Sequence, residues 1–322
     1  MSKNPVIFGC VCIGAITLFI AGMNQLTDLE QTAPVIQSVM KHRRRTDTAP
    51  FVHKEFIGPK PRPKRRQSST QVSLFCLVLT SESTSLKFKA VNDTWARRCN
   101  NTVFFTDRPE NVSNVVYLDA FRHGREHLTE KVVKAFQYVK SNFANYDWFL
   151  KADDDTYIIV DNLRVLLSYF SANDPVYLGQ NFKYFTKQGY HSGGAGYVIS
   201  KEALDRFIFG VESGTCANDG NDEDVDVGLC LESQGVVAYD STDSSRRETF
   251  HAGTMEEHIV GPKSPLLLNY PSMAAQVGRE CCSALTTSFH YVSPTNMHII
   301  DLLLYHITVH GRNFNASLDV FG

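Results

Sequence analysis

The sequence predicts an α/β domain built on a largely parallel sheet. Short apolar runs that are typical of buried strands alternate with segments whose apolar residues recur at helical spacing. The chain has 322 residues, of which 43% are hydrophobic and 20% charged, so it can bury a core of this kind. Because strands that alternate with helices are joined by crossovers, their pairing is expected to be mostly parallel.

Each element has a local reason. Strands are expected where a short apolar run is bounded by polar residues, at 72–79, 103–105, 115–118 and 148–150. Helices are expected where apolar residues recur every three or four positions, at 128–143, at 163–170 and after Ser200. Thr129 and Ser200 are expected to cap two of these helices, because a hydroxyl oxygen can accept from an unpaired N–H of the first turn.

The first part of the chain predicts a membrane anchor and an extended stem. Residues 6–23 form an uncharged run, almost wholly apolar or small, that is just long enough to span a bilayer. A cleaved signal peptide is the alternative, but Ala21-Gly22-Met23 is a poor small-x-small cleavage site. We therefore expect a cytoplasmic tail at 1–5, a signal anchor at 6–23, a stem at 24–70 and a single catalytic domain at 71–322.

Two features favour a lumenal position for that domain. Four Asn-x-Ser/Thr acceptors are present, at Asn92, Asn100, Asn111 and Asn315. Six cysteines follow the anchor, an even number that suits three disulfides: Cys76, Cys99, Cys216, Cys230, Cys281 and Cys282. Buried free thiols are the alternative, and the adjacent Cys281 and Cys282 are expected to have separate partners. The basic run in the stem is interpreted as a solvated tether, with no nucleic-acid partner in this compartment.

Three adjacent carboxylates directly follow the strand expected at 148–150. Asp153, Asp154 and Asp155 repel one another, so this arrangement is costly unless a cation neutralises it. Carboxylate oxygens suit Mg²⁺ or Mn²⁺, which also accept phosphate oxygens as ligands. Because side chains alternate along an extended segment, Asp153 and Asp155 are expected to face one site and Asp154 another. An acidic turn in solvent is the alternative.

A second acidic group, Glu223-Asp224, is expected in the first turn of a helix that begins near Asp222. Carboxylates are favourable there because the helix dipole is positive at its amino end, and this alone would explain them. The functional alternative is a general base that takes a proton from an attacking hydroxyl group.

Two further features are open to two interpretations. His251, in Glu248-Thr249-Phe250-His251, is either a buried structural histidine or a ligand. The glycine-rich segment 189–198 does not match a P-loop or a dinucleotide fingerprint. Its glycines are expected to permit a tight turn or the close approach of a ligand.

These segments resemble the β1,3-glycosyltransferase family, and within it the core 1 β1,3-galactosyltransferases. The resemblance runs from about residue 72 to 312 with order and spacing kept. It is carried by segments 94–99, 134–139, 147–157, 188–198, 200–204, 223–224, 248–251, 281–283 and 288–292.

The resemblance implies a GT-A fold, a type II position in the Golgi membrane, a homodimer, UDP-galactose as donor and Mn²⁺ as cofactor. The implied acceptor is GalNAc α-linked to Ser or Thr of a glycoprotein, which receives galactose at O3 with inversion. The implied metal ligands are Asp153, Asp155 and His251, and the implied base is Asp224. The implied nucleotide-sugar or acceptor-binding residues are Asp154, Tyr190, Gly193, Gly194 and Glu223.

One stretch departs from the family pattern. Core 1 enzymes carry a Trp/Tyr-rich segment before the paired cysteines, whereas residues 264–271 of this chain keep only Tyr270. Two alternatives therefore stay open beside a core 1 enzyme. One is a fringe-like or other β1,3-glycosyltransferase with a different donor or acceptor. The other is a weakly active or non-catalytic relative that acts as a chaperone.

Overall fold

The computed structural model describes residues 57–61, 72–81, 85–109, 111–118, 124–274, 276–308 and 310. These residues belong to a unit that runs from Lys54 to Gly322. The predicted tail and anchor, most of the predicted stem and Asn315 lie outside the described residues. Within the described ranges, no helix is both long and apolar enough to cross a membrane.

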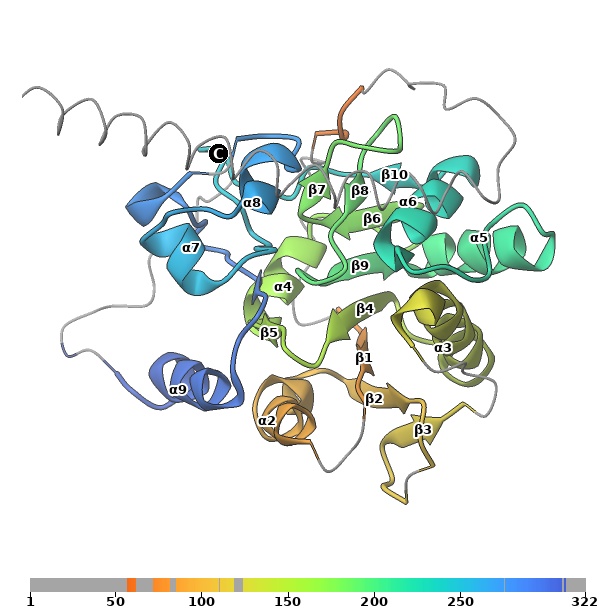
Figure 1. Ribbon diagram of the computed structural model, residues 1–322, viewed down its shortest axis with the longest axis horizontal. Helices are drawn as coiled ribbons and strands as arrows, with labels where there is room; N and C mark the ends of the chain where they lie inside the picture. Colours follow the sequence, from red (N-terminus) through yellow and green to blue (C-terminus); the bar gives the residue numbers. More distant parts are fainter. Residues whose placement is uncertain are drawn as a thin grey trace, which may run out of the picture. The chain divides into compact units, whose positions relative to one another are not determined.

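A seven-stranded mixed sheet lies at the centre of this unit (Figure 1). Its strands are β1 (Leu74–Leu79), β2 (Asn101–Thr106), β3 (Val115–Tyr117), β4 (Trp148–Asp153), β6 (Val176–Gly179), β9 (Tyr197–Ser200) and β10 (Val237–Ala238). They lie in the order β10-β6-β9-β4-β1-β2-β3. All neighbours pair in parallel except β9, which is antiparallel to both β4 and β6. The predicted α/β class is confirmed, and the expected parallel pairing fails only at β9.

Helices cover both faces of the sheet (Figure 1). One face carries α3 (Leu128–Phe143), α5 (Lys201–Glu212) and α6 (Glu223–Ser233), and the other carries α2 (Leu86–Asp93), α4 (Val160–Leu167) and α9 (Pro294–Tyr305). Alternate residues of β1 enter different cores, Cys76 and Val78 on the α2 side and Leu77 on the α3 side. Burial on both faces explains why the strand is a continuous apolar run.

Shorter elements complete the described part. They are η2 (Trp95–Arg98), η3 (Arg125–His127), β5 (Tyr157–Ile158), β7 (Asn181–Phe182), β8 (Tyr190–His191), α7 (Met255–Ile259), α8 (Pro265–Asn269), η4 (Gly278–Glu280) and β11 (Ser288–Phe289). β5 pairs antiparallel with β11, and β7 pairs antiparallel with β8.

One of the two expected helix caps is confirmed. The Ser200 hydroxyl accepts from the Ala203 N–H at the start of α5. The prediction for Thr129 is wrong, because α3 begins at Leu128 and the Thr129 hydroxyl instead donates to Asp226 at 2.7 Å. A tertiary partner on α6 therefore takes the hydroxyl that a local cap would use.

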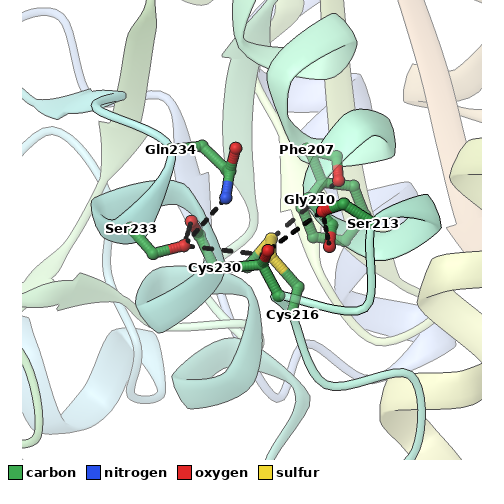
Figure 2. The surroundings of a disulfide bond; sticks show 8 residues. Phe207, Gly210, Ser213, Cys216, Cys230, Ser233 and Gln234 are labelled. Atoms are coloured by element: carbon green, nitrogen blue, oxygen red, sulfur yellow. Dashed lines mark hydrogen bonds between the residues drawn. A yellow bond between two sulfur atoms is a disulfide. The ribbon is translucent and has the colours of Figure 1, made fainter.

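All six cysteines from Cys76 onward form disulfides, Cys76–Cys99, Cys216–Cys230 and Cys281–Cys282. The expectation of separate partners for Cys281 and Cys282 is wrong. The fold brings the other four cysteines together in pairs, with Cα atoms 6.2 Å and 5.0 Å apart, so the adjacent pair is left to close on itself. Figure 2 shows Cys216–Cys230, which ties the segment after α5 to α6.

Part of the predicted stem runs beside the domain. The Lys60 N–H donates to the Ala238 carbonyl at 2.9 Å, and the Asp240 N–H donates to the Lys60 carbonyl at 2.6 Å. Residues 57–61 are thus hydrogen-bonded to the segment that contains β10. Part of the chain before the expected boundary at residue 70 therefore already contacts the folded domain.

Three predicted glycosylation acceptors are described. Asn100 and Asn111 are exposed, whereas Asn92 is half-buried. The side-chain oxygen of Asn100 accepts from the Leu74 N–H at 2.9 Å and from Arg164 at 2.8 Å. A glycan attached to the Asn100 side-chain nitrogen would therefore lie directly beside these two hydrogen bonds.

Candidate active site

The aspartate cluster lies where two central parallel strands end. Asp153 is the last residue of β4, and its register partner is Leu79, the last residue of β1. Thr80 follows β1 and donates its hydroxyl to Asp154 at 2.9 Å. The carboxyl ends of parallel strands are where open α/β sheets bind ligands, so the cluster stands at the expected edge.

A histidine completes a group of candidate metal ligands. Ligand atoms of Asp153, Asp155 and His290 all lie within 4.8 Å of one another, and His290 Nε2 is 3.2 Å from Asp155 Oδ1. Pairing of β5 with β11 produces this contact, because Asp155 lies just before β5 and His290 lies just after β11. The alternation along the chain predicts that Asp153 and Asp155 share one side, and the structure brings both to this group.

The His290 ring is oriented by a backbone carbonyl. Its Nδ1 lies 3.2 Å from the Ala252 oxygen. A carbonyl can only accept, so Nδ1 carries a proton in this hydrogen bond, and Nε2 is the nitrogen that would give its electron pair to a metal after releasing its own proton. Metal-binding histidines are commonly held in this way by a partner on the other nitrogen. The geometry thus presents Nε2 to the carboxylates.

Two lysines contact the same carboxylates. Lys87 Nζ lies 2.8 Å from Asp155 Oδ2, and Lys151 Nζ lies 2.8 Å from Asp153 Oδ1. Burial by itself would raise the pKa of Asp155, but hydrogen bonds from His290 and Lys87 hold that pKa below its usual value. Burial raises the pKa of Asp154 to about 6, despite the hydrogen bond from Thr80. Asp155 is therefore the more firmly ionised of these two neighbours.

These residues fit a divalent cation. Two carboxylates and one imidazole form a small, converging set of donors, and the carboxylates are the oxygen ligands that Mn²⁺ takes. Asp155 is held ionised, which a metal ligand must be. Lys87 and His290 contact different oxygens of Asp155, since Lys87 contacts Oδ2 while His290 faces Oδ1.

The candidate base lies in the first turn of α6, as the sequence predicts for residues after Asp222. One oxygen of Asp224 accepts from the Gly193 N–H at 3.0 Å, and the other accepts from the Val225 N–H at 2.9 Å. Burial raises the pKa of Asp224, and the Gly193 N–H opposes this rise. A carboxylate with a raised pKa is a stronger proton acceptor, which is the property that a general base requires.

Glu223 has a different setting from its neighbour. Its Oε1 lies 2.5 Å from Lys151 Nζ, and its Oε2 accepts from the Tyr197 hydroxyl at 3.2 Å. Burial raises the pKa of Glu223 to about 7, while the nearby Lys151 ammonium opposes the rise. Glu223 thus connects the start of α6 to Lys151 on β4 and Tyr197 on β9.

Two glycines of segment 189–198, Gly193 and Gly194, are required because other side chains lie very close to their backbone. A Cβ on Gly193 would overlap Glu223, and one on Gly194 would overlap the His290 ring. Only glycine leaves room for these side chains, so the segment brings the α6 carboxylates and the candidate metal ligands into one site. The expected close approach is thus to other parts of the protein itself.

Tyr190 belongs to an aromatic cluster beside α6. It is buried, its ring centroid is 5.7 Å from that of Phe182, and it packs against Gly228 of α6. Tyr270, retained in segment 264–271, lies 5.7 Å from Phe182 and 5.0 Å from Tyr184, measured between ring centroids. Tyr184 is 41% exposed, so this cluster reaches the surface.

The structure places His251 apart from the aspartates. Its ring is buried, with its centroid 4.8 Å from that of His258 and 4.5 Å from that of Phe289. It lies beside Cys281 and Cys282, which are bonded to each other and so offer no thiolate to a metal. Neither ring nitrogen has a hydrogen-bond partner among the described residues, and burial holds the pKa of His251 well below its usual value. His290 is the residue that the sequence interpretation missed, although it lies in the segment 288–292 that carries the family resemblance.

Comparisons with known proteins agree on one family. Residues 71–258 match the family model described as Fringe-like. A Xenopus laevis protein, glycoprotein-N-acetylgalactosamine 3-beta-galactosyltransferase 1, is 39% identical over 266 residues, which cover 80% of this chain and 73% of that protein. A Mus musculus beta-1,3-glucosyltransferase is 29% identical over 167 residues, which cover 49% of this chain but only 34% of that protein.

Similarity to solved structures is more distant. A mutant of Drosophila beta1,4galactosyltransferase 7, solved in complex with manganese, UDP-Gal and xylobiose, aligns with a TM-score of 0.32 and 19% identity. The alignment covers 52% of this chain and 64% of that chain, so it spans less than two thirds of the solved protein.

Proposed function

The chain belongs to the Fringe-like family, and on that premise we propose that it is an inverting glycosyltransferase of the GT-A type. It transfers galactose from UDP-galactose to O3 of GalNAc that is α-linked to Ser or Thr of a glycoprotein. The observation that carries this proposal is the 39% identity to the Xenopus galactosyltransferase over 80% of the chain.

The chemistry of the transfer suits the groups at the site. The donor sugar is α-linked to phosphate and the product is β-linked, so a single displacement inverts the anomeric centre. Such a displacement needs one base and no enzyme nucleophile. Asp224 is the proposed base, because it is the α6 carboxylate that the Gly193 N–H orients and its pKa is raised by burial.

We propose Asp153, Asp155 and His290 as the Mn²⁺ ligands, with His290 in place of the expected His251. When bound there, Mn²⁺ would neutralise negative charge on the diphosphate of the leaving group. Asp155 supplies an ionised oxygen, and Ala252 keeps His290 Nε2 directed to the same place. Asp154 accepts a hydrogen bond from Thr80, which holds the aspartate segment against the end of β1.

The remaining predictions follow the family. We propose a Golgi membrane protein of type II, anchored by residues 6–23, with its catalytic domain in the lumen. Three disulfides support an oxidising compartment. On the resemblance we also propose that the protein forms a homodimer. We propose further that Tyr190 and the aromatic residues around it are part of the acceptor region.

The test is a transfer assay with the full chain, UDP-galactose, Mn²⁺ and a GalNAc-α-peptide, followed by linkage analysis of the product. We expect a β1,3-linked galactose whose formation depends on Mn²⁺ and falls by about 10²–10⁴-fold with Asp224→Asn. Product with another UDP-sugar or another acceptor, and none from this pair, would establish the fringe-like or other β1,3-transferase. UDP binding without turnover on any donor would establish the non-catalytic alternative.

A further inference from the structure

A buried lysine lies between the two halves of the proposed site. Lys151 is 1% exposed, and its ammonium contacts Asp153 Oδ1 at 2.8 Å and Glu223 Oε1 at 2.5 Å. It also lies 3.4 Å from the Gly193 carbonyl oxygen. One ammonium thus contacts a proposed metal ligand, the first turn of α6 and the glycine segment.

The backbone under this lysine is firmly held. Lys151 lies on β4, where Leu77 of β1 is its partner on one side and Tyr197 of β9 on the other. Tyr197 also donates its hydroxyl to Glu223 at 3.2 Å, so the neighbouring strand contacts the same carboxylate. A buried ammonium is costly unless it is paired, and the paired carboxylates offset that cost only while the geometry is kept.

Two short connections lead from this ammonium to Asp224. The first is covalent, because Glu223 is the residue before Asp224 in α6. The second passes through Gly193, whose carbonyl faces Lys151 and whose N–H donates to Asp224 at 3.0 Å. Gly193 and Glu223 are packed tightly together, since a Cβ on Gly193 would overlap the Glu223 side chain.

We propose that Lys151 is a positioning residue, whose ammonium sets the distance between the metal ligand Asp153 and the base Asp224. Its burial leaves almost no surface of Lys151 for contact with a substrate, and the proposal rests on the proposed transfer reaction at this site. A base works only within about 2.6–3.2 Å of the hydroxyl that it deprotonates. A misplacement of about 1 Å can lower a rate by about 10²-fold. Loss of the bridge should therefore affect transfer to the acceptor more than binding of the donor.

The test compares Lys151→Met with Lys140→Met in the full chain. Lys140 forms an ion pair with Asp205 between α3 and α5, and both side chains are partly exposed, so it serves as the matched control. We expect Lys151→Met to lower kcat for transfer about 10²-fold per folded molecule, with the KM for UDP-sugar changed less than about threefold. Hydrolysis of UDP-sugar by water should persist, so the ratio of transfer to hydrolysis should fall. Lys140→Met should leave all three quantities unchanged.

A second variant distinguishes a loss of positioning from a loss of folding. Lys151→Met leaves Glu223 without its ammonium, whereas Lys151→Met combined with Glu223→Gln removes both charges and keeps an amide for the Tyr197 hydroxyl. The double variant is expected to unfold within a few degrees of the wild type and to show the same loss of transfer. An unchanged transfer-to-hydrolysis ratio in a folded variant would overturn the proposal, because a purely structural lysine changes only the amount of folded protein.

A crystal structure of the double variant tests the geometry without activity. The Asp224 carboxylate is expected to move away from Asp153 and to lose its bond to the Gly193 N–H. An unmoved Asp224 would overturn the positioning role, whatever the wild type transfers. Failure of the wild type to transfer any sugar would instead count against the proposed function, while the displacement of Asp224 would still be measured.

Discussion

The imidazole Nε2 of His290 lies 3.2 Å from Oδ1 of Asp155, at the edge of the sheet where β1 and β4 end. The contact exists because β11 pairs with β5 and brings the C-terminal part of the chain back to the aspartates. His251 lies instead against Phe289 and beside the Cys281–Cys282 disulfide. The two histidines should therefore respond differently to mutation.

His290→Ala should weaken UDP binding in the presence of Mn²⁺ by about tenfold or more, because it removes a ligand. His251→Leu should leave that binding within about twofold of the wild type and should not lower stability, since it replaces a buried imidazole that has no described hydrogen-bond partner. Titration calorimetry with UDP, with and without Mn²⁺, measures both. Equal losses in the two variants would remove the assignment of His290.

Asp155→Ala should abolish the Mn²⁺-dependent part of UDP binding, because Asp155 is the carboxylate held ionised beside His290. The control is Asp205→Ala, which breaks the ion pair between α5 and Lys140 on α3. That change should leave UDP affinity unaltered. Wild-type affinity in Asp155→Ala at saturating Mn²⁺ would contradict the metal site as proposed.

Transfer should be lost as the pH falls. Asp224 accepts a proton only when ionised, and burial raises its pKa above the ordinary value of 3.8. The acidic limb of the kcat/KM profile should therefore lie above that value, with activity present above the raised pKa and absent below it. Asp224→Asn should lower transfer by about 10²–10⁴-fold and leave UDP binding intact. A profile without an acidic limb would argue against Asp224 as the base.

Glu248 should make stability depend on pH. Burial raises the pKa of Glu248 to about 8, so the folded state holds its proton more tightly than the unfolded state does. Stability should therefore fall as the pH rises from about 4.5, the ordinary pKa of a glutamate, towards 8. Glu248→Gln should remove this loss and gain on the order of 1–3 kcal/mol at pH 8, with little difference at pH 4.

Urea unfolding of Glu248→Gln and wild type at the two pH values measures this difference, with the exposed Glu256→Gln as the control. Glu256→Gln should give the same small effect at both values. A gain for Glu248→Gln that does not grow with pH would show that Glu248 is ionised in the folded protein.

Local sequence patterns are enough to predict most elements. The apolar spacing between 128 and 143 predicts the helix α3, because apolar residues on one face of a helix must repeat at its period, although the predicted cap at Thr129 lies inside the helix. The run before the aspartates predicts β4, which continues to Asp153. What the pattern misses is the direction of β9, since a buried strand has the same apolar sequence whether its neighbours are parallel or antiparallel.

The sequence by itself determined that an acidic strand end and an acidic helix start exist in this chain. Those features depend on neighbouring residues, namely Asp153 with Asp155 and Glu223 with Asp224. Only the tertiary structure decided which histidine joins the aspartates, which cysteines pair, and that Lys151 bridges Asp153 to Glu223. The contacts of His290 and Lys151 join residues that are far apart in the chain. The Cys281–Cys282 bond forms because the other four cysteines pair among themselves. In each case the partners are set by how the strands are ordered in the sheet and by which side chains fit between them.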